Sequence, residues 1–302
     1  MEDRAKQRIF ILGSAGRLGA ALIKEWKNNA SFQLIGLSRM ELDFEHPENC
    51  LKTIKNFSPT PHDLIINCAA MTNVDRCEEE PEMAMQVNAT TPGLLAQLAA
   101  DAGARFLHVS TDYVFDGTLA RPYRETDLPH PISHYGASKL AGEEAVMTAS
   151  AHHYIARVSW VFGPERPSFV DQILERARIH DDVAAIDDKT SSPTYTHDLC
   201  KWLQVFMNTK INPPGGIYHL CNTGICSWRE YGEYALQAAA RKNISLRTAS
   251  VAPLKLSEMK NFIAQRPQHS ALDTTKFATI YGKQLRSWQQ AVEDYVSYIF
   301  CK

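Results

Sequence analysis

The chain has 302 residues, of which 44% are hydrophobic and 22% are charged, so it is longer than one ordinary domain and has the composition of a globular protein. Its formal net charge of −2 gives no reason to expect nucleic-acid binding or a basic membrane-binding face. Residues 1–8 lack the apolar core of a signal peptide, no apolar run is long enough to span a bilayer, and the seven cysteines are scattered, so we expect a cytoplasmic protein with reduced thiols and no membrane partner.

The first predicted element is a short apolar strand at residues 8–12, which leads directly into a glycine loop and then a helix. The loop has the spacing G-x-x-G-x-x-G. Glycine allows backbone amides to approach a pyrophosphate closely, and a helix N-terminus faces the phosphate charge. A plain glycine turn is the alternative. We expect the following loop and helix residues to bind a dinucleotide: Gly13, Gly16, Arg17, Leu18 and Gly19.

A second predicted strand, residues 32–37, ends at Ser38 and Arg39. NAD-specific sites usually carry an acid about 20 residues beyond the glycines, where it binds the ribose hydroxyls. A hydroxyl and a guanidinium suit the 2′-phosphate of NADPH instead. We therefore favour NADPH, although Asp43 lies nearby and leaves NADH open. An ordinary solvated arginine is the alternative for Arg39.

Strand and helix patterns then alternate as far as residue 160. Such alternation indicates βαβ units, so the fold class we expect is α/β, with a doubly wound parallel sheet of the Rossmann type. Beyond about residue 164 the pattern is mostly helical. We therefore expect an NADP-binding domain at 1–163 and a smaller, mainly substrate-binding domain at 164–302, with some later segments returning to the first. The predicted strands are 63–69, 105–110 and 154–160, and the predicted helices are 82–87, 92–102, 135–149, 169–180, 197–207, 228–241 and 288–300.

Tyr135 and Lys139 lie four residues apart in a predicted helix, so their side chains share one helix face. A nearby ammonium stabilises a phenolate and would lower the tyrosine pKa from about 10. Such a tyrosine can exchange a proton with a carbonyl oxygen. The pattern alone is common in helices, and it gains weight here from the glycine loop that precedes it.

Further candidate residues follow the predicted strands, at the sheet edge where ligands bind in open α/β folds. The Thr111 hydroxyl is suited to assist at a substrate carbonyl, or to cap a turn. The residues Ala69, Ala70 and Thr72 would let a nicotinamide ribose approach the backbone, or would serve tight helix–strand packing. Trp160 is suited equally to stacking on a sugar ring or nucleobase and to a position in the core.

Longer motifs run in order along nearly the whole chain. They are GSAGRLG from Gly13, DF from Asp43, NCAAMTNVDRCEEEP from Asn67, VNAT from Val87, STDYVFDG from Ser110, PYRETD from Pro122, YGASKLAGE from Tyr135, RVSWVFG from Arg157 and RPQHSALD from Arg266. With these motifs the chain resembles the extended short-chain dehydrogenases/reductases and, within them, the dTDP-4-dehydrorhamnose reductase family. The STDYVF, SWVFG and late RP elements are much more specific than the glycine loop.

The resemblance implies a reductase that transfers hydride from NADPH to the 4-keto group of a nucleotide-linked 6-deoxyhexose, with dTDP-4-dehydro-L-rhamnose as the expected substrate. It implies that Tyr135 donates the proton, that Lys139 holds the nicotinamide ribose and tunes the phenol, and that Thr111 assists. Asp43 and Phe44 would flank the adenine. The expected substrate-site residues are Thr72, Val74, Thr111, Asp112, Trp160 and Arg266.

Two departures from the family pattern concern the cofactor and a metal. Ser38 and Arg39 replace an acid that some members carry, which shifts the expected preference to NADPH. Ala21 stands where members that dimerise through a metal carry an acid, so we carry over neither the metal nor that dimer. Cys221 and Cys226 have no second pair to complete a zinc site, and no metal is expected. A monomer and a homodimer both stay open.

Two other classes of protein share this scaffold. The non-catalytic β subunit of methionine adenosyltransferase has most of these motifs, but it resembles the reductases less around Trp160, where this chain keeps RVSW. Sugar-nucleotide dehydratases generally show Thr-Asp-Glu, whose acidic pair serves elimination, whereas Asp112 is followed here by Tyr113. We therefore favour reduction over regulatory binding, dehydration or epimerisation.

Overall fold

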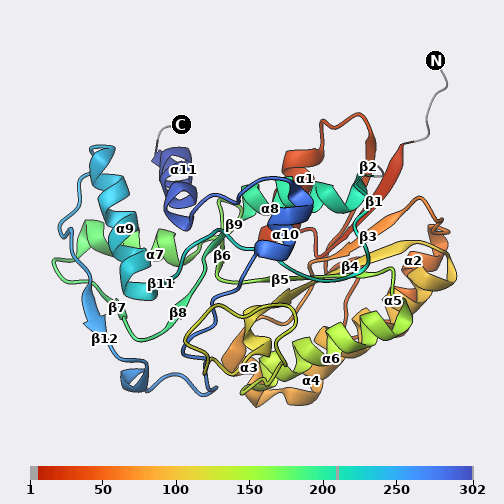
Figure 1. Ribbon diagram of the computed structural model, residues 1–302, viewed down its shortest axis with the longest axis horizontal. Helices are drawn as coiled ribbons and strands as arrows, with labels where there is room; N and C mark the ends of the chain where they lie inside the picture. Colours follow the sequence, from red (N-terminus) through yellow and green to blue (C-terminus); the bar gives the residue numbers. More distant parts are fainter. Residues whose placement is uncertain (1–5, 209–210, 301–302) are drawn as a thin grey trace.

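A parallel β-sheet forms the centre of the molecule. The computed structural model describes residues 6–208 and 211–300, and within these residues the sheet has six strands in the order β10-β5-β4-β3-β1-β2 (Figure 1). All of its adjacent strands are parallel, which confirms the expected α/β class. The strands are β1 Gln7–Leu12, β2 Phe32–Leu37, β3 Leu64–Asn67, β4 Arg105–Thr111, β5 Tyr154–Val158 and β10 Gly216–His219.

Helices cover both faces of this sheet. Successive side chains of a strand point to opposite faces, so apolar side chains on each face pack against helices. In β1, Ile9 and Ile11 share a core with α1 and α8, whereas Phe10 and Leu12 share a core with α2, α5 and α6. Figure 1 shows the two groups of helices on opposite sides of the sheet, which is therefore doubly wound as expected. These helices are α1 Arg17–Trp26, α2 Pro47–Asn56, α5 Thr91–Asp101, α6 His134–Ala149 and α8 Thr196–Leu203.

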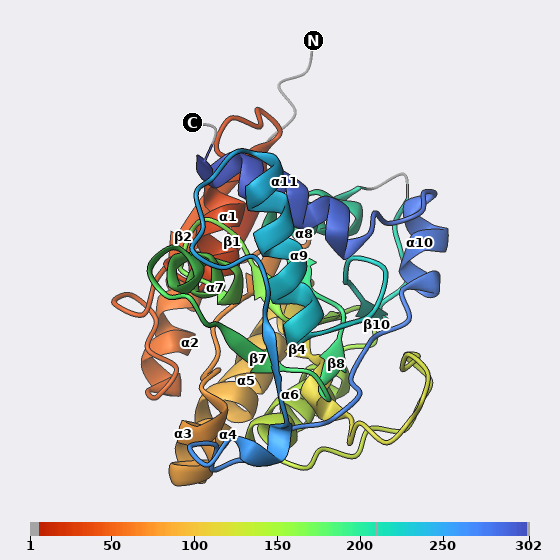
Figure 2. The same ribbon diagram turned by 90° about the vertical axis from the view of Figure 1, so that its left-hand side faces the viewer.

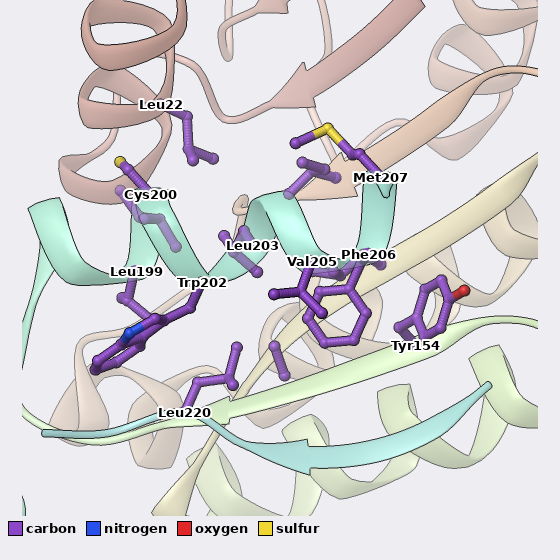
Figure 3. Packing of buried hydrophobic residues seen from close by; sticks show 14 of the residues in the cluster. Leu22, Tyr154, Leu199, Cys200, Trp202, Leu203, Val205, Phe206, Met207 and Leu220 are labelled. Atoms are coloured by element: carbon purple, nitrogen blue, oxygen red, sulfur yellow. The ribbon is translucent and has the colours of Figure 1, made fainter. Parts of the chain in front are cut away.

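Several segments that follow residue 164 pack on this sheet. Side chains of α8 and of the 3₁₀-helix η3 (Gln204–Met207), among them Leu203 and Phe206, pack in the same core as Tyr154 of β5 (Figure 3). The indole of Trp26 on α1 donates a hydrogen bond to the Cys200 carbonyl oxygen at 3.0 Å. Helix α10 (Thr275–Tyr281) joins this core through its buried phenylalanine. The domain boundary at residue 163 stays a prediction.

A second core lies beside the sheet (Figure 2) and is built around α7 (Phe169–Ile179), α9 (Trp228–Arg241) and α11 (Trp288–Phe300). The sequence predicted these helices to within a residue. It did not predict the short strands among them, which are too brief to show a period of two. They pair as β6 with β9, β8 with β11, and β7 with β12. Their bounds are β6 Val161–Phe162, β7 Ala184–Ile186, β8 Thr190–Ser191, β9 Thr194–Tyr195, β11 Cys226–Ser227 and β12 Ala252–Leu254.

The order of the strands in the sheet predicts a ligand-binding crevice at the carboxyl end of β1. Leu12, the last residue of β1, pairs with Leu37 of β2 on one side and with Asn67 of β3 on the other. Strand order reverses at this point, and open α/β sheets bind ligands where it does. The shorter elements near this edge and beyond it are α3 Val74–Glu79, α4 Pro81–Met85, the π-helical turn η1 Gln86–Thr90, and the 3₁₀-helices η2 Asp112–Val114 and η4 Leu256–Glu258.

No helix in the described part of the chain combines the length and apolar character needed to cross a membrane. The six described cysteines are all free thiols, five of them buried. Cys301 lies outside the described residues, so its expected reduced state concerns a residue that the structure does not describe. Residues 1–5, part of the segment expected to lack a signal peptide, also lie outside them.

Candidate active site

Two adjoining cavities occupy the crevice at the carboxyl ends of the strands. The Tyr135 cavity has a volume of about 520 Å³, and the Asp43 cavity has a volume of about 400 Å³. Each is named after a predicted site residue that lines it. The residues that line both cavities are Gly16, Cys68, Ala70, Thr72 and Arg166. A dinucleotide is an elongated ligand, and two cavities joined at a glycine loop fit its two halves.

The glycine loop has the close contacts that its motif predicts. Gly13 has a φ of 76°, and a Cβ there would lie 2.8 Å from the Ala69 amide nitrogen. A Cβ on Gly19 would lie 2.3 Å from the Gly13 carbonyl oxygen, so this glycine permits α1 to pack against the end of β1. Gly13 lines the Asp43 cavity, and Leu18 lines the Tyr135 cavity. The loop therefore fits the pyrophosphate of a dinucleotide.

Two arginines connect the glycine loop to the loop after β6. Arg17 lines the Tyr135 cavity and donates hydrogen bonds to the carbonyl oxygens of Val161 at 3.0 Å and Pro167 at 2.6 Å. Arg166 donates in the opposite direction, to the Ala15 carbonyl oxygen at 2.7 Å. It is the charged residue among those that line both cavities. The sequence gave no signal for Arg166, because it lies in an irregular loop.

The end of β2 differs from what the sequence predicted. The Ser38 hydroxyl and amide both donate to a carboxylate oxygen of Glu41, at 2.6 and 2.8 Å, and Ser38 does not line either cavity. Arg39 lines the Asp43 cavity and forms ion pairs with Asp43 and Glu45. The expectation that the acid is replaced at this strand end is therefore incomplete, because Glu41 folds back and places a carboxylate there.

Asp43 and Phe44, which by the resemblance would flank the adenine, line the cavity named after the first of them. Phe44 is buried and packs in the core that contains Leu12 and Leu37. An aromatic edge held in this way can border a flat adenine ring. Ala69 lines the same cavity, at the end of β3.

Tyr135 and Lys139 both line the Tyr135 cavity, where Lys139 is buried and Tyr135 is half-buried. Burial raises the pKa of Tyr135, and a hydrogen bond with Thr111 acts in the opposite direction. The Lys139 ammonium or amine donates to the Val109 carbonyl oxygen at 2.8 Å, and its Nζ lies 2.9 Å from His108 Nε2. Burial is therefore the main influence on the Tyr135 pKa, and the lowering that we expected from Lys139 is not among its causes.

Thr111 and Asp112 line the Tyr135 cavity and also hold local structure. Thr111 Oγ1 accepts from the Tyr113 amide at 3.2 Å, so the predicted catalytic position and the predicted turn cap coincide. The Asp112 carboxylate is buried, and one of its oxygens accepts hydrogen bonds from three serine hydroxyls that come from separate segments. These are Ser159 at 2.8 Å, Ser191 at 3.0 Å and Ser270 at 2.5 Å. Asp112 thus fixes the cavity wall, and the sequence did not reveal its serine partners.

Trp160 lies between β5 and β6 with a φ of 40°, which few residues other than glycine adopt. Its half-buried indole lines the Tyr135 cavity and contacts Trp228 and Tyr231, with ring centroids 5.6 and 6.3 Å away. Its Nε1 is buried without a hydrogen-bond partner among the described residues. Trp160 therefore packs against other aromatic rings and lines the cavity at the same time, and its stacking on a sugar ring or nucleobase stays a prediction.

The remaining predicted substrate-site residues divide into two groups. Thr72 and Val74 line the Tyr135 cavity, from the end of β3 and the start of α3. Arg266 lies outside the lining of both cavities. Its guanidinium forms an ion pair with Asp75 at 2.7 Å and stacks over Phe262 at 3.6 Å from the ring centroid. These partners engage the Arg266 guanidinium outside both cavities, and its contact with substrate stays a prediction.

The comparisons with known proteins agree with this arrangement. A family model described as RmlD substrate binding domain matches residues 7–300. The chain is similar to the dTDP-4-dehydrorhamnose reductase of Aggregatibacter actinomycetemcomitans, with 32% identity over 96% of this chain and 99% of that protein. It is also similar to the enzyme of that name from Escherichia coli K12, with 34% identity over 85% of this chain and 86% of that protein.

Solved structures give the same result. A dTDP-4-dehydrorhamnose reductase from Bacillus anthracis in complex with NADP superimposes with a TM-score of 0.85 and 30% identity, covering 96% of this chain and 97% of that one. A UDP-glucose 4-epimerase from Thermotoga maritima superimposes with a TM-score of 0.78 but only 18% identity, covering 97% of this chain and 98% of that one, so it shows the shared fold alone.

Proposed function

Because this chain belongs to the family described as RmlD substrate binding domain, we propose that it is an NADPH-dependent reductase that converts dTDP-4-dehydro-L-rhamnose to dTDP-L-rhamnose. One observation carries the proposal. Tyr135, Lys139 and Thr111 line a single cavity, and that cavity joins a second one at the glycine loop. This arrangement supports a proton donor beside a site that fits the reacting end of a dinucleotide.

The chain's own residues supply the binding sites for the cofactor. Gly13 and Gly16 leave room for the pyrophosphate, and Arg166 provides a positive charge at the junction of the cavities. Asp43 and Phe44 border the adenine site. When bound, NADPH supplies the hydride that reduces the sugar carbonyl, and the protein supplies orientation and the proton.

The region around β2 supports both nicotinamide cofactors. Arg39 lines the Asp43 cavity and suits the 2′-phosphate of NADPH. The Glu41 carboxylate lies at the end of β2 but is bonded to Ser38 and does not line the cavity, so it would have to turn away from Ser38 to bind the ribose hydroxyls of NADH. The NADP-bound relative favours NADPH. We propose NADPH as the preferred cofactor and NADH as a weaker alternative.

Tyr135 has the properties of a general acid. Burial raises its pKa, so the phenol keeps its proton at neutral pH and can donate it to the oxygen of the 4-keto group. Thr111 hydrogen-bonds to the phenol and lines the same cavity, so it can align the phenol with that oxygen. In this proposal, Trp160 and residues 164–302 position the sugar nucleotide, with Trp160 forming part of the wall.

A substrate panel tests the proposed function. NADPH oxidation would be followed with dTDP-4-keto-6-deoxyglucose and the matching epimerase, and in parallel with the UDP and GDP counterparts. We expect oxidation with the dTDP sugar and much less with the others. NADPH binding without oxidation of the cofactor in any of the three reactions would support the regulatory class instead. Interconversion of sugars without net NADPH consumption would support an epimerase.

A further inference from the structure

A buried polar pair lies behind Lys139 on the two strands next to the site. Asn67 ends β3 and His108 lies in β4, and both side chains are fully buried. Asn67 Oδ1 accepts a hydrogen bond from the Ala69 amide at 3.0 Å. A backbone amide can only donate, so this bond fixes the orientation of the Asn67 amide. Its NH₂ group therefore faces His108 Nδ1, at 2.9 Å.

The hydrogen bonds of this pair fix the tautomer of His108. Because Asn67 donates to Nδ1, that nitrogen carries no proton, and a neutral imidazole must then carry its proton on Nε2. Burial lowers the pKa of His108 well below its usual value, which keeps the ring neutral. Nε2 lies 2.9 Å from Lys139 Nζ, so it donates to the lysine nitrogen. An ammonium has no lone pair to accept this bond, whereas a neutral amine does.

Helix α6 packs closely on β4 beside this contact. A Cβ on Gly142 of α6 would lie 3.3 Å from His108 Nε2 and 2.1 Å from the Asn88 carbonyl oxygen. Helix α6 therefore lies directly on β4 at this point, and Lys139 is buried between them. The Nζ donates its own hydrogen bond to the Val109 carbonyl oxygen at 2.8 Å.

We propose that Asn67 and His108 are positioning residues that set the protonation state of Lys139. With the Asn67 amide as oriented, Lys139 is a neutral amine. To bind a proton, Lys139 requires His108 to move its own proton to Nδ1. Asn67 must then turn its carbonyl oxygen toward His108 and lose the bond from the Ala69 amide. Protonation of Lys139 is thus coupled to the tautomer of His108 and to the Asn67 amide.

The other groups that face Lys139 agree with this coupling. They are Glu143 on α6 and Cys68 after β3, both of which favour the charged lysine. Glu143 is itself paired with Arg157 at 2.6 Å, and burial raises the pKa of Cys68 to about 12, so Cys68 is a neutral thiol at working pH. Burial outweighs both groups and lowers the pKa of Lys139 to about 8. The amine is therefore favoured above that pH and the ammonium below it.

The catalytic consequence rests on the proposed reductase function. After Tyr135 donates its proton, an ammonium at Lys139 stabilises the phenolate, and a neutral amine does not. Turnover should therefore fall as the pH rises through the pKa of Lys139, which is about 8. A substitution that lets Lys139 bind a proton without this rearrangement of His108 and Asn67 should move the loss of turnover to higher pH.

Nitrogen-15 NMR of the histidine rings tests the hydrogen-bond part without any substrate. The chain contains a reference for each tautomer. His153 Nδ1 accepts from the Phe106 amide at 3.2 Å, so its proton is on Nε2. His219 Nδ1 faces the carbonyl oxygens of Tyr123 and Asp273 at 3.1 and 3.2 Å, so its proton is on Nδ1. About one unit above the Lys139 pKa, His108 should match His153. A match to His219 overturns the proposal.

Asn67→Asp is the matched variant. The carboxylate has nearly the same shape and accepts both from the Ala69 amide and from a proton on His108 Nδ1. His108 should then match His219, and the alkaline fall in turnover should move up by about one pH unit. His108→Gln, whose amide can also present an acceptor to Lys139, should move the fall in the same direction.

The two parts of this proposal fail separately. An Nε2 proton that persists in a folded Asn67→Asp protein, or an alkaline fall that neither variant moves, overturns the proposed coupling. The wild type and Asn67→Asp could show the expected tautomers while neither oxidises NADPH with any sugar nucleotide. That result would support the coupling and contradict only the proposed function.

Discussion

Arg166 reaches back across 151 residues of sequence to the glycine loop, where its Nε and Nη2 donate to the Ala15 carbonyl oxygen at 3.0 and 2.7 Å. Arg17, at the start of α1, donates to the Val161 carbonyl oxygen of β6 and to the Pro167 carbonyl oxygen of the loop that carries Arg166. The two guanidinium groups therefore connect the two cores at the point where the cavities join. This connection places a positive charge where the glycine loop fits a pyrophosphate.

Arg166→Ala should therefore weaken NADPH and NADH to a similar degree, because the pyrophosphate is common to both. Loss of a hydrogen bond to a charged group corresponds to about 1.5–3 kcal/mol of binding free energy. Isothermal titration calorimetry would measure the change. Arg178→Ala, an exposed arginine on α7, is the control and should leave both affinities unchanged. Unchanged cofactor binding in Arg166→Ala would leave the residue only its role in connecting the cores.

Arg39 and Glu41 should have opposite effects on the choice of cofactor. Arg39→Ala should weaken NADPH by about 1.5–3 kcal/mol and leave NADH nearly unaffected, because only NADPH carries the 2′-phosphate. Glu41→Gln removes a negative charge from the end of β2 and should increase the preference for NADPH. Binding of both cofactors to the two variants checks this. Equal losses of both cofactors in Arg39→Ala would show that its ion pairs with Asp43 and Glu45 are structural.

Tyr135→Phe should reduce turnover by a factor of roughly 100 to 10,000, the range for loss of a positioned proton donor. The affinity for NADPH should change little, because the ring and its contact with Tyr113, at 5.5 Å between centroids, are retained. Steady-state kinetics and cofactor titration on the same preparation measure both quantities. Turnover within threefold of wild type would remove the phenol from the mechanism.

Trp160→Ala should raise the KM for the sugar nucleotide or lower kcat, because the indole forms part of the cavity wall. The loss of stability should be smaller than the roughly 3–5 kcal/mol of a fully buried aromatic residue, since Trp160 is only half-buried. Trp228→Ala removes the neighbouring indole, which lies tilted at 59° to that of Trp160 and does not line either cavity, and is the matched control. A melting temperature lowered by ten degrees or more with an unchanged KM would refute the binding role.

The sequence predicted the parts of this structure that depend on local patterns. The strand of β1, the glycine loop and α1 follow one another within twenty residues, and Tyr135 and Lys139 need only one turn of helix to share a face. Each of these features has its physical cause in neighbouring residues. The doubly wound parallel sheet follows from the alternation of strands and helices, which leaves few topologies.

The features that the sequence did not predict are contacts that no repeating pattern in the sequence indicates. Arg266 pairs with Asp75 across 191 residues, and this ion pair keeps it out of the cavity. Glu41 turns back on Ser38 through a local bend that no period in the sequence indicates. The pKa of Tyr135 depends on how deeply the folded chain buries it, so the proximity of Lys139 alone gave the wrong direction.

Transfer of a deuterium label from [4-²H]NADPH tests the central claim most directly. The protein would be incubated with dTDP-4-dehydro-L-rhamnose and NADPH labelled at the hydride that is transferred, and the sugar product would be examined by NMR. We predict one deuterium at C4 of dTDP-L-rhamnose with the wild-type chain, and little or no labelled product with Tyr135→Phe in the same time. Unlabelled sugar from a chain that binds both ligands would contradict the proposed reductase.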